Sequence, residues 1–158
     1  MREIKFRAWH IEFKKMFSAK EMGEDELTLA VDGRGFVNVS SVSTKLSGYA
    51  GNKMIPLQFT GLKDKNGVEI YEGDIVKWKT SEQQKQDDFY ELEDTVIYYS
   101  GGFYIGGIQL TDCFTPNNIL TDRKRRSEGA LGEDYFYIDF DFEVIANIYE
   151  NPELLKTI

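Results

Sequence analysis

Three carboxylates, Asp139, Asp141 and Glu143, alternate with aromatic and apolar residues near the end of the chain. Alternate residues of a β-strand point to the same face of its sheet, so the three side chains are predicted to share one face. Carboxylate oxygens are the ligands that Mg²⁺ and Ca²⁺ prefer, and such a row could serve a metal-dependent enzyme. A solvated sheet face opposite an apolar row explains the pattern more simply, so we assign no metal ligand.

The chain has one histidine and one cysteine, His10 and Cys113. An imidazole can act as a general base, but a lone histidine in a turn beside Trp9 is predicted to be a surface residue. Cys113 has no basic neighbour in the sequence that would favour its thiolate, so it is predicted to be inert. The sequence contains no P-loop, dinucleotide fingerprint, nucleophile elbow or zinc signature. We therefore predict no catalytic residue and no cofactor.

The charge and hydropathy of the chain also exclude some classes of function. A net charge of −8 disfavours general affinity for nucleic acid or anionic membranes. No apolar run approaches the roughly 20 residues that a membrane-spanning helix needs. Residues 1–3 lead directly into an alternating segment rather than an apolar signal sequence, so we expect a cytoplasmic location and no membrane partner.

The segment 57–78 gives the strongest local prediction. Asn66-Gly67 favours a type I′ turn between strands at 59–63 and 68–71, and Glu72-Gly73 reverses the chain again before a strand at 74–79. The residues assigned structural roles in these turns and at the bend before them are Gly61, Asp64, Asn66, Gly67, Gly73 and Asp74.

Further hairpins and strands are predicted outside this segment. Alternation indicates an opening strand at 2–9 and a last strand region at 135–149, and short apolar runs around glycine turns indicate hairpins at 27–39 and 96–105. The stretch 81–94 is polar and acidic, so it is predicted to be a solvated loop or a helix with a weak apolar face. Asn151 as N-cap and Pro152 at the first helical position predict a short C-terminal helix.

These elements predict a mainly β protein with α+β character only at the margins. We expect a small bent sheet or an SH3-like barrel, with additional strands and a short C-terminal helix. The chain is predicted to be a single domain, 1–158. Its parts are N-terminal strands at 1–55, a core hairpin or barrel at 56–79, a polar loop at 80–95, and C-terminal strands and the helix at 96–158, with a flexible loop at 116–134.

Three groups of segments carry a resemblance to a known family. They are 4–9 with 14–16, 58–67 through 70–76, and 144–155, and together they resemble the YopX family of small phage and prophage proteins. His10 stands where such proteins often have Asp, and Ala146 where Gly is frequent. The resemblance implies a phage or prophage origin, the cytoplasm of a host cell as location, a mainly β fold and self-association into a homo-oligomer. It implies no established activity, so no catalytic residues are carried over.

The function predicted from these observations is that of a non-catalytic accessory protein, which self-associates and binds a host or phage protein. Exposed aromatic side chains and the acidic surface would form the binding surface, and the candidate aromatic residues are Trp9, Tyr71 and Trp78. One alternative is a nucleic-acid-binding protein that uses the basic N-terminal strand, although the net charge disfavours it. The second alternative is the metal-dependent enzyme with the acidic strand 139–143. The basic residues of the first alternative are Arg2, Lys5, Arg7, Lys14 and Lys15, with Lys77, Lys79 and the run 123–126.

Overall fold

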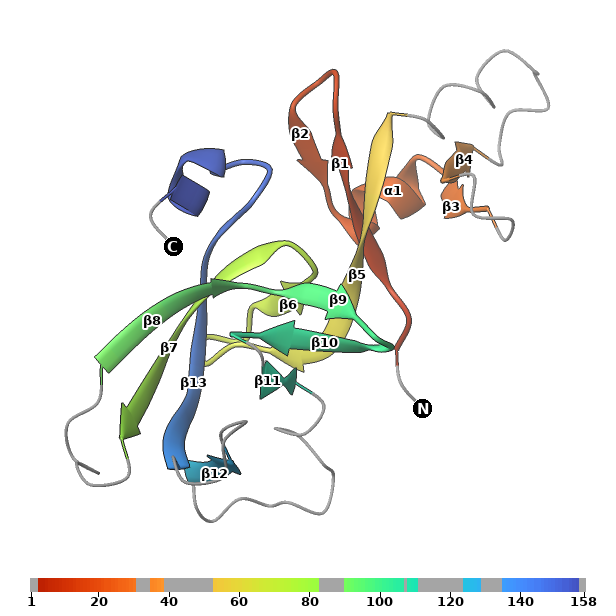
Figure 1. Cartoon of the computed structure of the whole chain (residues 1–158). Helices are drawn as coiled ribbons and strands as arrows, with labels where there is room; N and C mark the ends of the chain where they lie inside the picture. Colours follow the sequence, from red (N-terminus) through yellow and green to blue (C-terminus); the bar gives the residue numbers. More distant parts are fainter. Residues whose placement is uncertain are drawn as a thin grey trace. The chain divides into compact units, whose positions relative to one another are not determined.

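The chain forms two compact units, Met1–Gly61 and Leu62–Ile158, and each is described separately (Figure 1). The structure is a computed structural model, and it describes residues 3–30, 35–38, 53–82, 90–106, 108–110, 124–128 and 135–156. Strand β5 (Met54–Lys63) passes from the first unit into the second. The assignment of the whole chain to a single domain stays a prediction.

The first unit is built around strand β1 (Phe6–His10), which pairs antiparallel with β2 (Lys15–Phe17) on one side and with β5 on the other. Ala8 and His10 are buried on the face of β1 that the alternating pattern predicted to be apolar. Ala8, Met22, Phe36 and Met54 form the buried cluster of this unit. Its remaining elements are α1 (Ala19–Glu24), β3 (Leu27–Leu29) and β4 (Phe36–Asn38), and β3 and β4 form the predicted hairpin.

Helix α1 was not predicted, although its start signal is present in the sequence. The Ser18 hydroxyl accepts a hydrogen bond from the Glu21 amide (3.2 Å), and the Glu21 carboxylate accepts one from the Ser18 amide (2.8 Å), which completes a capping box. The Ser18 amide, together with Lys15 and the Ser18 hydroxyl, lowers the pKa of Glu21 to about 2. A serine followed three residues later by a glutamate was therefore the signal that sequence reasoning missed.

The second unit is dominated by two long antiparallel strands, β7 (Asp74–Glu82) and β13 (Tyr135–Asn147), which pair with each other. β8 (Tyr90–Thr95) and β12 (Lys124–Glu128) lie on the outer sides of this pair, so the order of the sheet is β12-β13-β7-β8. A smaller sheet consists of β9 (Ile97–Tyr99), β10 (Gly102–Ile105) and β11 (Ile108–Gln109), in the order β11-β10-β9. The other elements are β6 (Glu69–Tyr71) and the 3₁₀ helix η1 (Pro152–Lys156).

The mainly β prediction is confirmed, as are the central hairpin and the position of the C-terminal helix, which is 3₁₀. Two register shifts in β13, between Asp139 and Glu143 and between Val144 and Ala146, interrupt its regular pairing with β7. Irregularities of this kind increase the bend and twist of a strand. They account for the curled sheet of this unit (Figure 1).

The turn type predicted for Asn66-Gly67 is wrong. Of the residues in this turn only Gly67 has a positive φ, 84°. The Gly67 amide donates to the Asp64 carbonyl (3.0 Å) and the Asp64 amide to the Val68 carbonyl (2.8 Å), so the loop has three residues and ends in a glycine bulge. A two-residue loop with positive φ at both positions is present instead at Ser100 (47°) and Gly101 (86°).

Part of the predicted polar loop at 80–95 is strand. β7 continues to Glu82, and β8 pairs along it, with Leu92 opposite Trp78. This segment forms a strand rather than a loop because its side chains alternate between core and surface. Leu92 packs against the core, while the Glu91 carboxylate lies 2.5 Å from Lys77 Nζ on the surface. Within the predicted flexible loop at 116–134, β12 pairs with β13, and the rest of that stretch lies outside the described residues.

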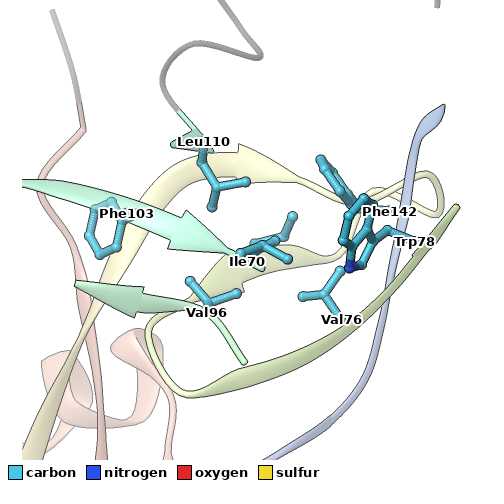
Figure 2. Close-up of a cluster of buried hydrophobic side chains, with 8 residues drawn as sticks. Ile70, Val76, Trp78, Val96, Phe103, Leu110 and Phe142 are labelled. Atoms are coloured by element: carbon cyan, nitrogen blue, oxygen red, sulfur yellow. The ribbon is translucent and has the colours of Figure 1, made fainter. Parts of the chain in front are cut away.

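The core of the second unit is one cluster of side chains from several strands. Figure 2 shows Ile70 of β6, Trp78 of β7 and Phe142 of β13 pointing into the same interior as the other members. Ile70 is fully buried and Trp78 is 5% exposed. The buried members are Ile70, Val76, Trp78, Val96, Phe103, Ile105, Leu110 and Phe142.

This packing predicts a contrast between two residues of the central hairpin. Ile70→Ala should lower the free energy of unfolding of the second unit by about 2–5 kcal/mol, because it leaves a cavity in a closed core. Val68→Ala, at a side chain that is 48% exposed, should change it by only about 0.5 kcal/mol. Urea unfolding in a Trp9→Phe background, followed by Trp78 fluorescence, measures both. Equal losses in the two variants would contradict the assignment of the core.

Candidate functional site

The best-defined polar site is the carboxylate of Asp64, which fixes the central hairpin to β13. Oδ1 accepts hydrogen bonds from the amides of Asn66 and Val68, both at 2.8 Å, and Oδ2 accepts one from the amide of Val144 at 3.1 Å. The Lys65 amide adds a bond to the Phe142 carbonyl (2.9 Å). Asp64 is 7% exposed, so its carboxylate is closed off from water and committed to the backbone.

These bonds determine the charge state of Asp64. Burial raises the pKa of the carboxyl group, but the amides of Val144, Val68 and Asn66 lower it more, and the net shift is downward. A carboxylate that accepts several backbone hydrogen bonds is stabilised in its ionised form. Asp64 is therefore a charged structural group and is not available as a general acid.

The second turn of the segment is fixed in a similar way. Asp74 is 1% exposed, and its Oδ2 accepts a hydrogen bond from the Tyr71 amide at 2.8 Å. The Gly73 amide donates to the Val96 carbonyl (2.9 Å), and the Gly73 carbonyl accepts from the Ile148 amide (2.9 Å). Gly73 has a φ of 80°, which L-residues rarely adopt, so glycine is required at this position. The turn ties β7 to the end of β13 and to the segment before β9.

Asn147 is a buried polar residue that sequence reasoning missed. Its Oδ1 accepts hydrogen bonds from the amides of Tyr149 (3.0 Å) and Glu150 (2.9 Å), and its Nδ2 donates to the Glu150 carboxylate. The available signal was an Asn at the end of a strand. Asn side chains commonly accept hydrogen bonds from the backbone amides two and three residues further along the chain. Asn151 and Pro152 lie at the start of η1, as predicted, and the Asn151 carbonyl accepts from the Leu154 amide.

The three aromatic residues proposed as partner contacts lie in different environments. Tyr71 and Trp78 are 6% and 5% exposed, and Tyr71 donates its hydroxyl proton to Glu69. Trp78 belongs to the core cluster (Figure 2). Packing is therefore the role of these two rings in this structure. Trp9 is half-buried in β1, and its contact with a partner stays a prediction.

A second carboxyl group, Asp94, lies beside the indole of Trp78. A Cβ atom at Gly106 would be 2.7 Å from Asp94 Oδ2 and 3.0 Å from Trp78 Cζ2, so Asp94 and Trp78 both lie close to Gly106. Burial raises the pKa of Asp94, and the Trp78 indole opposes this shift. Trp78 Nε1 nevertheless has no partner in hydrogen-bond geometry among the described residues, so its attraction to Asp94 is weaker than a hydrogen bond.

His10 is not the surface residue that the sequence predicted. It is 7% exposed, its Nδ1 accepts a hydrogen bond from the Phe13 amide (3.2 Å), and its ring stacks on Phe13 with centroids 4.1 Å apart. The prediction failed because it treated His10 as a turn residue, whereas it is the last residue of β1 and points inward with Ala8. Cys113 lies outside the described residues.

Of the acidic row Asp139, Asp141 and Glu143, the structure describes the side chain of Glu143. The register between β13 and β7 shifts between Asp139 and Glu143, which interrupts the regular alternation that the prediction assumed. The Glu143 carboxylate pairs with Lys65 Nζ at 2.5 Å. Among the described side chains, no three His, Cys, Asp or Glu groups come together as metal ligands. The metal-site hypothesis for Asp139 and Asp141 stays untested.

Three consecutive residues of β9 have exposed apolar side chains, and we define them as the β9 edge: Ile97, Tyr98 and Tyr99. Their exposed fractions are 51%, 50% and 69%. The Tyr98 ring meets Phe103 edge-on (5.1 Å), and the Tyr99 ring meets Tyr104 edge-on (6.3 Å). In the described part of its sheet, β9 is the outer strand. Three consecutive apolar residues in a short strand, where a half-buried strand would alternate, were the signal for this surface.

Comparison with known proteins agrees with this architecture. The fold and its buried turn residues define a mainly β protein in which a few buried polar side chains hold the backbone turns in place. The chain belongs to the YopX family, because the family model described as YopX protein matches residues 5–156. This confirms the resemblance seen in the sequence.

A solved structure, that of protein EF1440 from Enterococcus faecalis, is similar at 26% identity with a TM-score of 0.50. The match covers 98% of this chain and 99% of that one. No curated protein matches the chain. No helix within the described ranges is long and apolar enough to cross a membrane.

Asp64 and Asp94 provide a matched pair for a pH experiment. At about pH 7, Asp64→Asn should lower the free energy of unfolding by about 1–3 kcal/mol, because an amide cannot replace a carboxylate that accepts three backbone bonds. The pKa of Asp64 is lowered below 3.8, so its contribution is present above that value and is lost as the pH falls through the folded-state pKa. The difference between wild type and Asp64→Asn should therefore shrink in acid.

The same substitution at Asp94 is the control. Its pKa is raised above 3.8, so the ionised group costs stability at neutral pH and this cost disappears in acid. Asp94→Asn should raise stability at neutral pH and approach the wild type as the pH falls. Chemical denaturation across the acid range measures both variants. A loss for Asp64→Asn that does not change with pH would contradict the role of its charge.

Proposed function

We propose that this protein is a non-catalytic accessory protein of phage or prophage origin, which acts in the cytoplasm of its host, self-associates and binds a partner protein. The observation that carries the proposal is the β9 edge, where three consecutive apolar side chains are each half or more exposed. Contiguous exposed apolar surface on a folded protein commonly marks an interaction site. Membership of the YopX family is compatible with this role.

The buried polar groups support a non-catalytic role. Asp64, Asp74 and Asn147 each accept hydrogen bonds from backbone amides within their own unit. A general acid or base must instead present its polar atom to a substrate. Because these side chains are closed off and used by the backbone, we assign the function to the surface.

The distribution of charge supports self-association. Residues 1–61 hold nine basic and seven acidic residues, a net charge of +2. Residues 62–158 hold ten basic and twenty acidic residues, a net charge of −10. Opposite charge on two parts of one chain favours contact between the first unit of one copy and the second unit of the next.

The nucleic-acid alternative receives less support. Two cations of the basic N-terminal strand region already face aromatic rings of the same unit, with Lys5 Nζ 4.8 Å from the Phe59 ring centre and Lys15 Nζ 4.4 Å from that of Phe17. Lys15 also pairs with Glu21 at 2.9 Å. Binding of a single strand would have to compete with these contacts. We therefore keep protein binding as the proposal.

Purified protein tests the proposal directly. Size-exclusion chromatography with light scattering should give a mass above that of one chain, and higher salt should lower it, because the contact between copies is electrostatic. Affinity capture from lysogenic cells should retain a specific protein, and a Tyr99→Ser variant should lose it. A strict monomer that captures no phage or host protein would refute the proposal.

A further inference from the structure

The hairpin of β9 and β10 determines which backbone groups of β9 face outward. Its loop has two residues, Ser100 and Gly101, both with positive φ, as in a type I′ turn. In such a hairpin the residues next to the loop, Tyr99 and Gly102, exchange both hydrogen bonds, and the next pair, Tyr98 and Phe103, exchanges none. The amide and carbonyl of Tyr98 therefore point away from β10.

Val96, two residues before Tyr98, also directs its backbone groups away from β10. Val96 donates its amide proton to the Asp74 carbonyl (2.8 Å) and accepts from the Gly73 amide (2.9 Å), so both of its backbone groups are used on the outer side. Val96 lies between β8 and β9. Among the described residues, backbone pairing on this side ends at Val96, and the amide and carbonyl of Tyr98 are the next donor and acceptor.

The side chains of β9 would contact an added strand on both faces. Ile97 and Tyr99 lie on the same face as Tyr104, since directly opposed residues share a face. Tyr98 lies on the other face, with Phe103. A partner in extended conformation could pair with Tyr98 through its backbone and place alternate side chains against the tyrosines, which is the mode called β-augmentation.

Charge indicates what kind of segment fits. The second unit has a net charge of −10, and residues 82–95, which lead directly into β9, include six acidic residues and one basic residue. Glu91 of this run is already paired with Lys77 and Lys79. Tyrosine rings also attract cations through their faces. A segment with Lys or Arg at alternate positions matches both features.

The same charge disfavours a second copy at this edge. Pairing of β9 with the β9 of another copy would bring two units together that each carry a net charge of −10. Like charge of this size opposes association. Self-association is better served by the contact between oppositely charged units described above.

We propose that the outer edge of β9 is a docking site for an extended, Lys- or Arg-bearing segment of a partner protein, which adds as a strand at Tyr98 between the exposed Ile97 and Tyr99 side chains. The inference rests on the proposed protein-binding function and names the chemistry of the partner.

Three short peptides test the proposal against the intact protein. The first is acetyl-Lys-Val-Lys-Val-Lys-Val-Lys-amide. The second has Glu in place of each Lys, and the third has the central Val replaced by Pro, which keeps the charge but blocks strand pairing. Binding is followed at low salt by amide chemical shifts and by hydrogen exchange at Tyr98. Only the first peptide should slow exchange of the Tyr98 amide, and the proline peptide should bind about tenfold more weakly.

Two variants give the matched control. Tyr99→Lys adds a positive charge at a side chain that is 69% exposed, and it should weaken binding of the first peptide about tenfold. Ile4→Lys makes the same change of charge at a side chain of the first unit that is 74% exposed, and it should leave binding unchanged. Neither position is buried, so both variants should fold.

Several results would overturn the inference. Equal binding of the proline peptide would show charge attraction without strand addition, and equal binding of the Glu peptide would remove the cationic requirement. Protection of the Tyr98 amide that rises with protein concentration in the absence of peptide would assign the edge to a second copy. A protein that self-associates and captures a partner but ignores the Lys peptide retains its proposed function and loses this docking site.

Discussion

The second unit depends on one carboxylate. Asp64 brings the turn of the central hairpin and the middle of β13 together by accepting backbone amides from both, across 80 residues of sequence to Val144. Burial of a charged group is costly unless its hydrogen bonds are satisfied. The lowered pKa of Asp64 shows that the amides outweigh burial here. The buried Asp64 carboxylate is therefore stable only while the hairpin and β13 both keep their amides in position.

The position of β13 in turn determines the surface that carries the proposed function. β13 pairs with β7, and the turn before β7 bonds through Gly73 to Ile148 just beyond β13 and to Val96 just before β9. The β9–β10 hairpin directs the Tyr98 amide and carbonyl outward, and the bonds of Val96 to Gly73 and Asp74 lie just before β9. The buried polar groups Asp64, Asp74 and Asn147 hold backbone geometry, and the proposed contact with a partner lies at the exposed β9 edge.

Local chemistry made part of this fold predictable from sequence. Gly67 and Gly73 identified the two turns, and alternation identified β1 and β13. Three features could not be obtained in this way. The acceptor role of Asp64 toward Val144 depends on contact between distant segments, the burial of His10 depends on which face of β1 is covered, and β8 is a strand because the side chain of Leu92 has a core to pack against. The β9 edge was visible as three consecutive apolar residues, but its exposure required the pairing of the sheet.

Native-state hydrogen exchange at the Val144 amide tests the central claim most directly. In wild type this amide donates to Asp64 Oδ2, whereas the Met22 amide of the first unit donates to the Ser18 carbonyl and serves as the internal reference. We expect Asp64→Asn to speed exchange at Val144 by about tenfold or more and to leave Met22 unchanged. Unchanged protection at Val144 would contradict the claim that this carboxylate holds the hairpin and β13 together.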